Sequence, residues 1–128
     1  MDTPLVKLEK AIFGEYGISP DYPFGEGDYP VFRHPTNRKW FAIVLTDAPG
    51  GYFGRKESVV ALNLKCDPLL ADGIRDGKKI FPAYHMNKRH WISVPLDEST
   101  DVNEIMALVS VSYRLTEPKK RPAGDKEE

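Results

Sequence analysis

Aromatic, imidazole and cationic side chains are concentrated in residues 81–94, which read Phe-Pro-Ala-Tyr-His-Met-Asn-Lys-Arg-His-Trp-Ile-Ser-Val. A second cationic group, which consists of Arg33, His34, Arg38 and Lys39, lies at the turn predicted at residues 34–37. Cationic side chains bind phosphate groups and aromatic rings stack on bases, so we predict that two cationic hairpin tips bind DNA and that Tyr84 and Trp91 stack on its bases. The candidate nucleic-acid-binding residues are Arg33, Arg38, Lys39, Tyr84, His85, Asn87, Lys88, Arg89, His90 and Trp91.

A simpler interpretation explains the same residues. Hairpin turns collect Lys, Arg and Asn because turns are exposed to solvent, and Tyr84 and Trp91 would then only face the core. The formal net charge of -1 gives no overall attraction to nucleic acid, so DNA binding would need a local patch. The alternative function is therefore a non-catalytic domain that binds a small molecule or another protein.

Proton transfer or metal binding is a third interpretation, because imidazole side chains can transfer protons or ligate metals, and His85 and His90 lie on either side of Asn87. The two histidines lie five residues apart around a turn with no adjacent carboxylate, and zinc sites need three or four protein ligands. Cys66 is expected to be a small buried hydrophobe, and alternation along a strand places Lys65 on the other side. We therefore expect no catalytic residues, no metal and no cofactor.

Length and composition indicate one globular domain. The chain has 128 residues, of which 41% are hydrophobic and 29% charged, and its apolar runs are too short to span a bilayer. The N-terminal residues lack the pattern of a secretory signal, and the single Cys66 cannot form an internal disulfide. These features predict a cytoplasmic monomer that does not associate with membranes.

The order of predicted elements indicates an α+β fold. Alternating strands and long crossover helices are missing, which excludes a doubly wound parallel sheet and favours an antiparallel β-sheet packed against N- and C-terminal helices. Residues 1–116 form the predicted domain, and residues 117–128 a disordered charged tail. The elements expected in chain order are a helix from Thr3-Pro4 to Gly17, a loop over 18–30 pinned to the core by Phe24, strands over 31–33 and 40–45, a turn from 47, a strand over 58–65, a short helix from Asp67-Pro68 to about Arg75, strands over 80–84 and 90–96, and a helix capped by Asp101.

Several motifs in residues 1–116 resemble the MmcQ/YjbR family of small bacterial proteins. They are Pro23-Phe24-Gly25, Arg38 to Ala42, Leu62 to Pro68, Pro82 to Lys88, His90-Trp91 and Ser112 to Leu115. The resemblance implies a fold similar to the bacterial frataxin homologue CyaY, and the "double wing" description of the family implies DNA binding. It implies no catalytic motif. A frataxin-like fold would also suggest iron binding, but the first helix carries only Glu9 and Glu15, which do not form an acidic cluster on one face.

Overall fold

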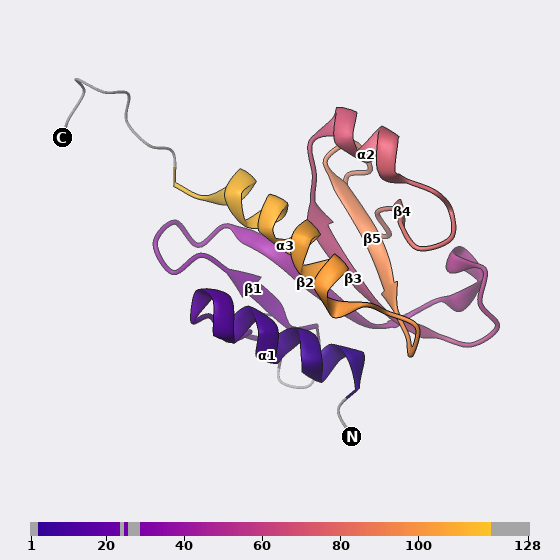
Figure 1. Ribbon diagram of the computed structural model, residues 1–128, viewed down its shortest axis with the longest axis horizontal. Helices are drawn as coiled ribbons and strands as arrows, with labels where there is room; N and C mark the ends of the chain where they lie inside the picture. The colour runs from indigo at the N-terminus through magenta and orange to yellow at the C-terminus, as the bar shows by residue number, and fades with distance from the viewer. Residues whose placement is uncertain (1–2, 24, 26–28, 119–128) are drawn as a thin grey trace.

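A five-stranded antiparallel sheet forms the centre of the molecule, and two helices, α1 and α3, lie side by side on one of its faces (Figure 1). This computed structural model describes residues 3–23, 25 and 29–118. The strand order is β1-β2-β3-β5-β4, which confirms the predicted α+β fold with helices near both ends. The elements are α1 (Pro4–Tyr16), β1 (Val31–Arg33), β2 (Trp40–Ala48), the 3-10 helix η1 (Gly50–Phe53), β3 (Val59–Lys65), α2 (Pro68–Ile74), β4 (Phe81–Pro82), β5 (Trp91–Leu96) and α3 (Val102–Thr116).

Local sequence signals set the ends of the helices. The Thr3 hydroxyl accepts a hydrogen bond from the Val6 amide at 3.2 Å, and Gly17, with φ 69°, ends α1 in the left-handed conformation. Asp67 and Asp101 cap α2 and α3 in the same way, each accepting an amide hydrogen bond at 2.9 Å from the residue two positions later. Among the described residues, no helix has the length and apolar character needed to cross a membrane.

The sheet has an apolar cluster on each face. The helix-side core contains Leu8, Ile12, Phe41, Leu62 and Val109 among its buried members. The second core contains Val31, Ile43, Leu45, Ala48, Phe53, Ala61 and Phe81. Its buried members come from the strands and η1 rather than from α1 or α3, so the sheet face opposite the two long helices is covered only in part.

The strand predicted over 80–84 is shorter in the structure, because β4 contains only Phe81 and Pro82. Side chains replace the ladder beyond this point: the Tyr84 amide donates to the Ser93 hydroxyl at 2.8 Å, and the Asn63 amide group donates to the Tyr84 carbonyl at 2.9 Å. The predicted anchoring role of Phe24 lies outside the described residues, as do residues 119–128 of the predicted tail.

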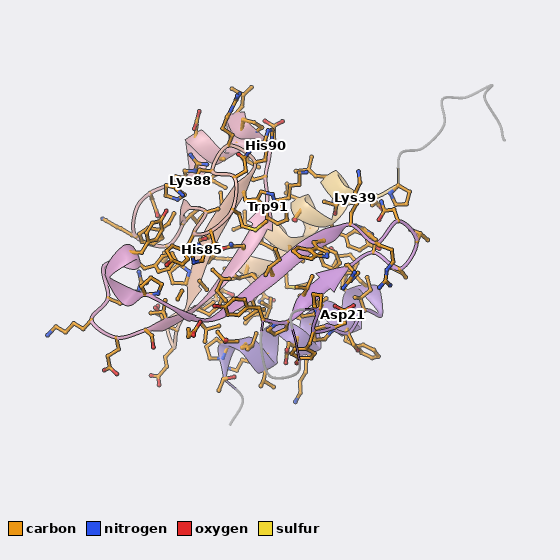
Figure 2. The ribbon with its side chains drawn as sticks, turned by 180° about the vertical axis from the view of Figure 1, so that it is seen from behind. Asp21, Lys39, His85, Lys88, His90 and Trp91 are labelled. Carbon is orange, nitrogen blue, oxygen red and sulfur yellow. The ribbon has the colours of Figure 1, made fainter. Side chains whose placement is uncertain are left out.

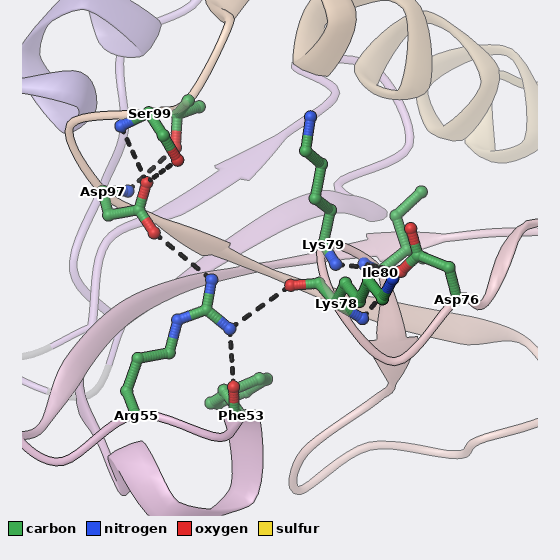
Figure 3. A network of polar contacts seen from close by, with 9 residues as sticks. Phe53, Arg55, Asp76, Lys78, Lys79, Ile80, Asp97 and Ser99 are labelled. Carbon is green, nitrogen blue, oxygen red and sulfur yellow. Dashed lines mark hydrogen bonds and ion pairs between the residues drawn. The ribbon is translucent and has the colours of Figure 1, made fainter.

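A polar cluster ties together the loops at the end of the sheet where β5 finishes. The Arg55 guanidinium, between η1 and β3, donates to the Asp97 carboxylate at 3.2 Å and to the Lys78 carbonyl at 3.3 Å (Figure 3). In the neighbouring turn, Asp76 accepts amide hydrogen bonds from Ile80, Lys78 and Lys79, which lower the pKa of its carboxyl to about 2. These contacts use polar groups internally, to hold loops in place.

Candidate functional site

The two predicted cationic turns extend from the same end of the sheet. Trp40 is the first residue of β2, Lys65 the last of β3 and Trp91 the first of β5. Lys65 pairs with Trp91, and because Ala42 pairs with Leu64, Trp40 lies about one residue beyond the level of Lys65 on the adjacent strand. The turns that precede β2 and β5 therefore flank the end of β3, and Figure 2 shows Lys88, His90, Trp91 and Lys39 across the upper half of the molecule.

Five cationic side chains gather at this edge, which we call the basic end: Arg38, Lys39, Lys65, Lys88 and Arg89. In the part of the chain that the structure describes, none of these except Arg38 lies in an ion pair. The Arg38 guanidinium is 3.9 Å from the Asp21 carboxylate, a loose and exposed pair of little energetic weight. Most of the positive charge of the basic end is therefore not neutralised by ion pairs within the described residues.

Acidic side chains are concentrated at the opposite end of the sheet. There the end of β2, the start of β3, the turn before β4 and the segment joining β5 to α3 carry Asp47, Glu57, Asp76, Asp97, Glu98, Asp101 and Glu104, against Arg55, Lys56, Lys78 and Lys79. The acidic residues near the basic end are Asp67 and Glu117, which lie close to it in the sequence, and Asp21, which contacts Arg38. A net charge of -1 thus conceals a separation of charge along the strands.

Two residues expected at the first cationic tip contact other parts of the structure. Arg33 is partly buried and forms an ion pair with Asp21 at 2.9 Å. His34 is 2% exposed and its Nε2 lies 3.0 Å from the Tyr113 carbonyl and 2.9 Å from the Thr116 hydroxyl. Placing His34 among the tip cations was therefore wrong: a sequence reading based on turn exposure cannot see that the end of α3 covers this ring.

The last turns of α3 hold the basic end in place. The Ser112 hydroxyl donates to the Phe41 carbonyl at 2.5 Å and accepts from the Lys65 amide at 2.9 Å. The Asn37 side chain donates to the Thr116 carbonyl at 2.9 Å. One helix therefore fixes the start of β2, the end of β3 and the turn that carries Arg38 and Lys39.

The other cationic turn is fixed by a buried polar network. The Ser93 hydroxyl donates to the Asn63 side-chain oxygen and accepts from the Tyr84 amide, while Asn63 donates to the Tyr84 carbonyl. Asn63 and Ser93 are each 0% exposed, so the network links β3, β5 and the segment after β4 in the interior. It sets where the turn with His85, Lys88 and Arg89 begins.

Each cationic turn also contains a non-glycine residue with a left-handed backbone. Arg38 and His85 both have φ of 65°, a conformation that costs L-residues other than Asn and Asp about 1–2 kcal/mol. The turns are held by bonds such as that from the Arg38 amide to the His34 carbonyl at 3.0 Å and that from the Arg89 amide to the Asn87 side chain at 2.8 Å. Strain of this kind is common where a turn presents side chains for binding.

An aromatic group lies beside the basic end, on the sheet face away from α1 and α3. Trp40, Tyr84, Met86 and Trp91 are partly buried and pack against the second core. The Lys65 ammonium lies 6.0 Å from the centre of the Trp91 ring. Tyr84 and Trp91 thus pack against the second core, as the simpler interpretation expects, but both also keep part of their surface exposed.

Trp40 and Lys65 are not among the candidates predicted from the sequence, and only strand pairing places them at the basic end. Residues 40 and 91 are far apart in the sequence, and the antiparallel pairing of β2, β3 and β5 places them on either side of Lys65. The residues around β3 give no indication in the sequence that this strand pairs with β5 rather than with β4.

The structure separates the residues of the catalytic interpretation. Cys66 is 3% exposed in the helix-side core, and burial raises the pKa of its thiol, whereas Lys65 lies beside Trp91 on the other face. His85 and His90 are both exposed. Among the described residues, no group of three or more His, Cys, Asp or Glu side chains is arranged to hold a metal ion.

Comparison with known proteins gives consistent results. The family model described as YjbR matches residues 15–115. YyaQ from Bacillus subtilis (strain 168) is 40% identical over 110 residues, which cover 84% of this chain and 92% of the relative, and YjbR from Escherichia coli (strain K12) is 39% identical over 59 residues, covering 45% and 50%. Both carry the name "uncharacterized protein".

Solved structures share the architecture. A crystal structure of a Pseudomonas syringae protein matches with a TM-score of 0.79 and 36% identity, covering 88% of this chain and 97% of that one. The Deinococcus radiodurans protein DR2400, described as a DUF419 domain, matches with a TM-score of 0.65 and 25% identity, covering 88% and 78%.

Proposed function

The chain belongs to the YjbR family, whose members YyaQ and YjbR are named only as uncharacterized proteins, and we propose that it binds nucleic acid through the basic end. The observation that supports this proposal is the placement of Lys39, Lys65 and Lys88. They come from three separate segments, and strand register brings them to one end of the sheet. The composition of the two turns predicts DNA as the nucleic acid that is bound.

The charge at the basic end suits a polyanion better than a small anion. The cationic side chains are spread along the ends of three strands, and adjacent strands lie about 4.8 Å apart, so the row from β2 to β5 spans about 10 Å. Such a row can contact successive phosphates of a chain. Contacts of this kind are made largely by releasing counterions, so they weaken as salt concentration rises.

The salt dependence can be estimated from the number of contacts. If four side chains contact phosphates of a single strand, the slope of log affinity against log salt is about -3, and affinity falls about 50-fold between about 50 and 200 mM salt. An apolar site for a small molecule or protein would change little over this range. Salt dependence therefore separates the proposal from its main alternative.

The test compares two charge reversals of equal size. Lys39→Glu with Lys88→Glu changes the basic end, and Lys56→Glu with Lys78→Glu makes the same charge change on exposed residues elsewhere. Fluorescence anisotropy with labelled 20-nucleotide DNA, single-stranded and duplex, measures affinity at several salt concentrations. We expect the first pair to abolish binding and the second to lower affinity severalfold at most. Equal losses in both pairs, or a protein that binds no DNA at low salt, would refute the proposal.

A protein-interaction domain is the second candidate, and one observation favours it. Phe13 on α1 is 58% exposed and borders a groove lined also by Val6 and Pro20. Amide NMR shifts distinguish the two functions, because DNA would perturb residues 37–40, 65 and 85–91, whereas a partner on α1 would perturb residues 6–20.

Three further expectations accompany the proposal: the protein is a monomer, it acts in the cytoplasm, and its fold resembles that of CyaY. Light scattering, cell fractionation and superposition on CyaY test them in turn.

A further inference from the structure

The chain contains two tryptophans, and both lie at the basic end. Trp40 begins β2 and Trp91 begins β5, with Lys65 between them at the end of β3. Both indoles pack against the second core from its rim, so they belong to the same face of the sheet. The spacing of two strands places their backbones about 10 Å apart.

This face differs from the helix-covered face in what it offers to a ligand. The long helices α1 and α3 lie on the far side of the sheet, and Trp91 is visible near the centre of the view in Figure 2. Trp40, Tyr84 and Trp91 are each partly exposed, although indole and phenol rings are large enough to be buried as core residues elsewhere. Flat aromatic groups at the rim of a sheet, next to cations, provide stacking surfaces for unpaired bases.

We propose that the ligand is single-stranded nucleic acid, with one base stacked on Trp91, another on Trp40, and the intervening backbone at Lys65. This inference rests on the proposed function, because it takes the basic end as the phosphate site and names the form of nucleic acid that it holds. The Lys65 ammonium, 6.0 Å from the Trp91 ring centre, is close enough to reach a phosphate beside a base that is stacked there.

Base stacking would add affinity to the phosphate contacts of the five cationic side chains at the basic end. Phosphate contacts alone favour any nucleic acid, and duplex DNA most, because of its higher charge density. Paired bases are unavailable to Trp40 and Trp91, so only a single strand gains the stacking contribution, which is worth about 5-fold to 150-fold per base. Single strands should therefore bind more tightly than duplexes of the same length.

The two tryptophans make the test direct, because all indole fluorescence comes from the site. Oligothymidine, an oligonucleotide of equal length that lacks bases, and a duplex of equal length are titrated into the full chain while fluorescence and anisotropy are recorded. We expect oligothymidine to quench the fluorescence and to bind at least 10-fold more tightly than the abasic strand. Trp40→Phe and Trp91→Phe, which each leave one reporter and an aromatic ring, should retain binding and show quenching of the remaining indole.

Trp91→Leu keeps an apolar side chain against the second core but removes the stacking surface. It should lower affinity for oligothymidine about 5-fold to 150-fold while leaving the weaker affinity for the abasic strand unchanged. The comparison of oligothymidine with the abasic strand needs no variant, so it remains decisive if Trp91→Leu fails to fold.

The outcomes separate this inference from the proposal on which it rests. Equal affinity for oligothymidine, abasic strand and duplex, without quenching, would overturn base stacking and leave phosphate binding at the basic end in place. Binding of none of the three would overturn both. Tighter binding of the duplex than of the single strand would overturn the stated ligand while supporting the basic end.

Discussion

Replacing Ser93 with alanine tests whether the buried polar network positions the second cationic turn. The Ser93 hydroxyl is 0% exposed, donates to the Asn63 side-chain oxygen and accepts from the Tyr84 amide at 2.8 Å. Alanine is nearly the same size, so it leaves little cavity and removes chiefly these two hydrogen bonds. Two buried polar groups then lack their partner.

The expected loss follows from those two groups. A buried polar group left without a partner costs about 1–3 kcal/mol, and Asn63 keeps its 2.9 Å bond to the Tyr84 carbonyl, which limits how far the segment can shift towards another partner. We expect Ser93→Ala to lower the free energy of unfolding by about 2–4 kcal/mol, a large part of the 5–15 kcal/mol typical of a domain.

Urea unfolding followed by circular dichroism measures this loss. The midpoint should fall while the slope m stays constant, because the surface exposed on unfolding is unchanged. Ser99→Ala is the matched control: its hydroxyl also donates to a side chain, Asp97, but it is exposed, so the loss should stay within about 0.5 kcal/mol. A loss for Ser93→Ala as small as that of the control would refute the idea that this network anchors the turn.

Three further changes test other parts of the structure. His34→Ala should lower the free energy of unfolding by about 2–4 kcal/mol in urea, because it removes a buried ring and its bonds to the end of α3; a loss below 1 kcal/mol would contradict that role. Arg38→Gly should raise that free energy by up to about 1 kcal/mol, because glycine accepts φ 65° without strain, whereas Arg38→Val should lower it. The Asp76 carboxyl should titrate near pH 2 in a carbon-13 NMR experiment, and a midpoint near 3.8 would show that its amide bonds do not form. Since its folded pKa lies below the unfolded value, its contribution to stability is present above about pH 4 and is lost as the pH falls towards 2.

The elements that the sequence predicts well depend on neighbouring residues. Thr3-Pro4 and Gly17 bound α1, and Asp67-Pro68 begins α2, as expected, because capping and proline act within one helical turn. The predicted strand over 80–84 fails beyond Pro82 because Asn63 and Ser93 take the backbone groups of Tyr84. Neither side chain is close to this segment in the sequence.

The candidate site shows the same division between local and distant information. Lys39, Lys88 and Trp91 are recognisable from the composition of two turns, but whether the turns face one another depends on the strand order. Lys65 becomes part of the site only because β3 separates β2 from β5. His34 is excluded from the basic end because its ring contacts the end of α3, which is distant in the sequence.

The separation of charge decides what kind of affinity this protein can have. A net charge of -1 gives almost no attraction at distances beyond the Debye length of about 8 Å at physiological salt, so the basic end acts only on a ligand already close to it. Affinity must then come from contacts made at short range, where Lys39, Lys65 and Lys88 are supplemented by Trp40 and Trp91.

Adding positive charge at the distant acidic end, as in Glu98→Lys, should therefore speed association with DNA at low salt without slowing dissociation. A change in the dissociation rate, measured by stopped-flow fluorescence, would mean that DNA contacts more of the surface than the basic end.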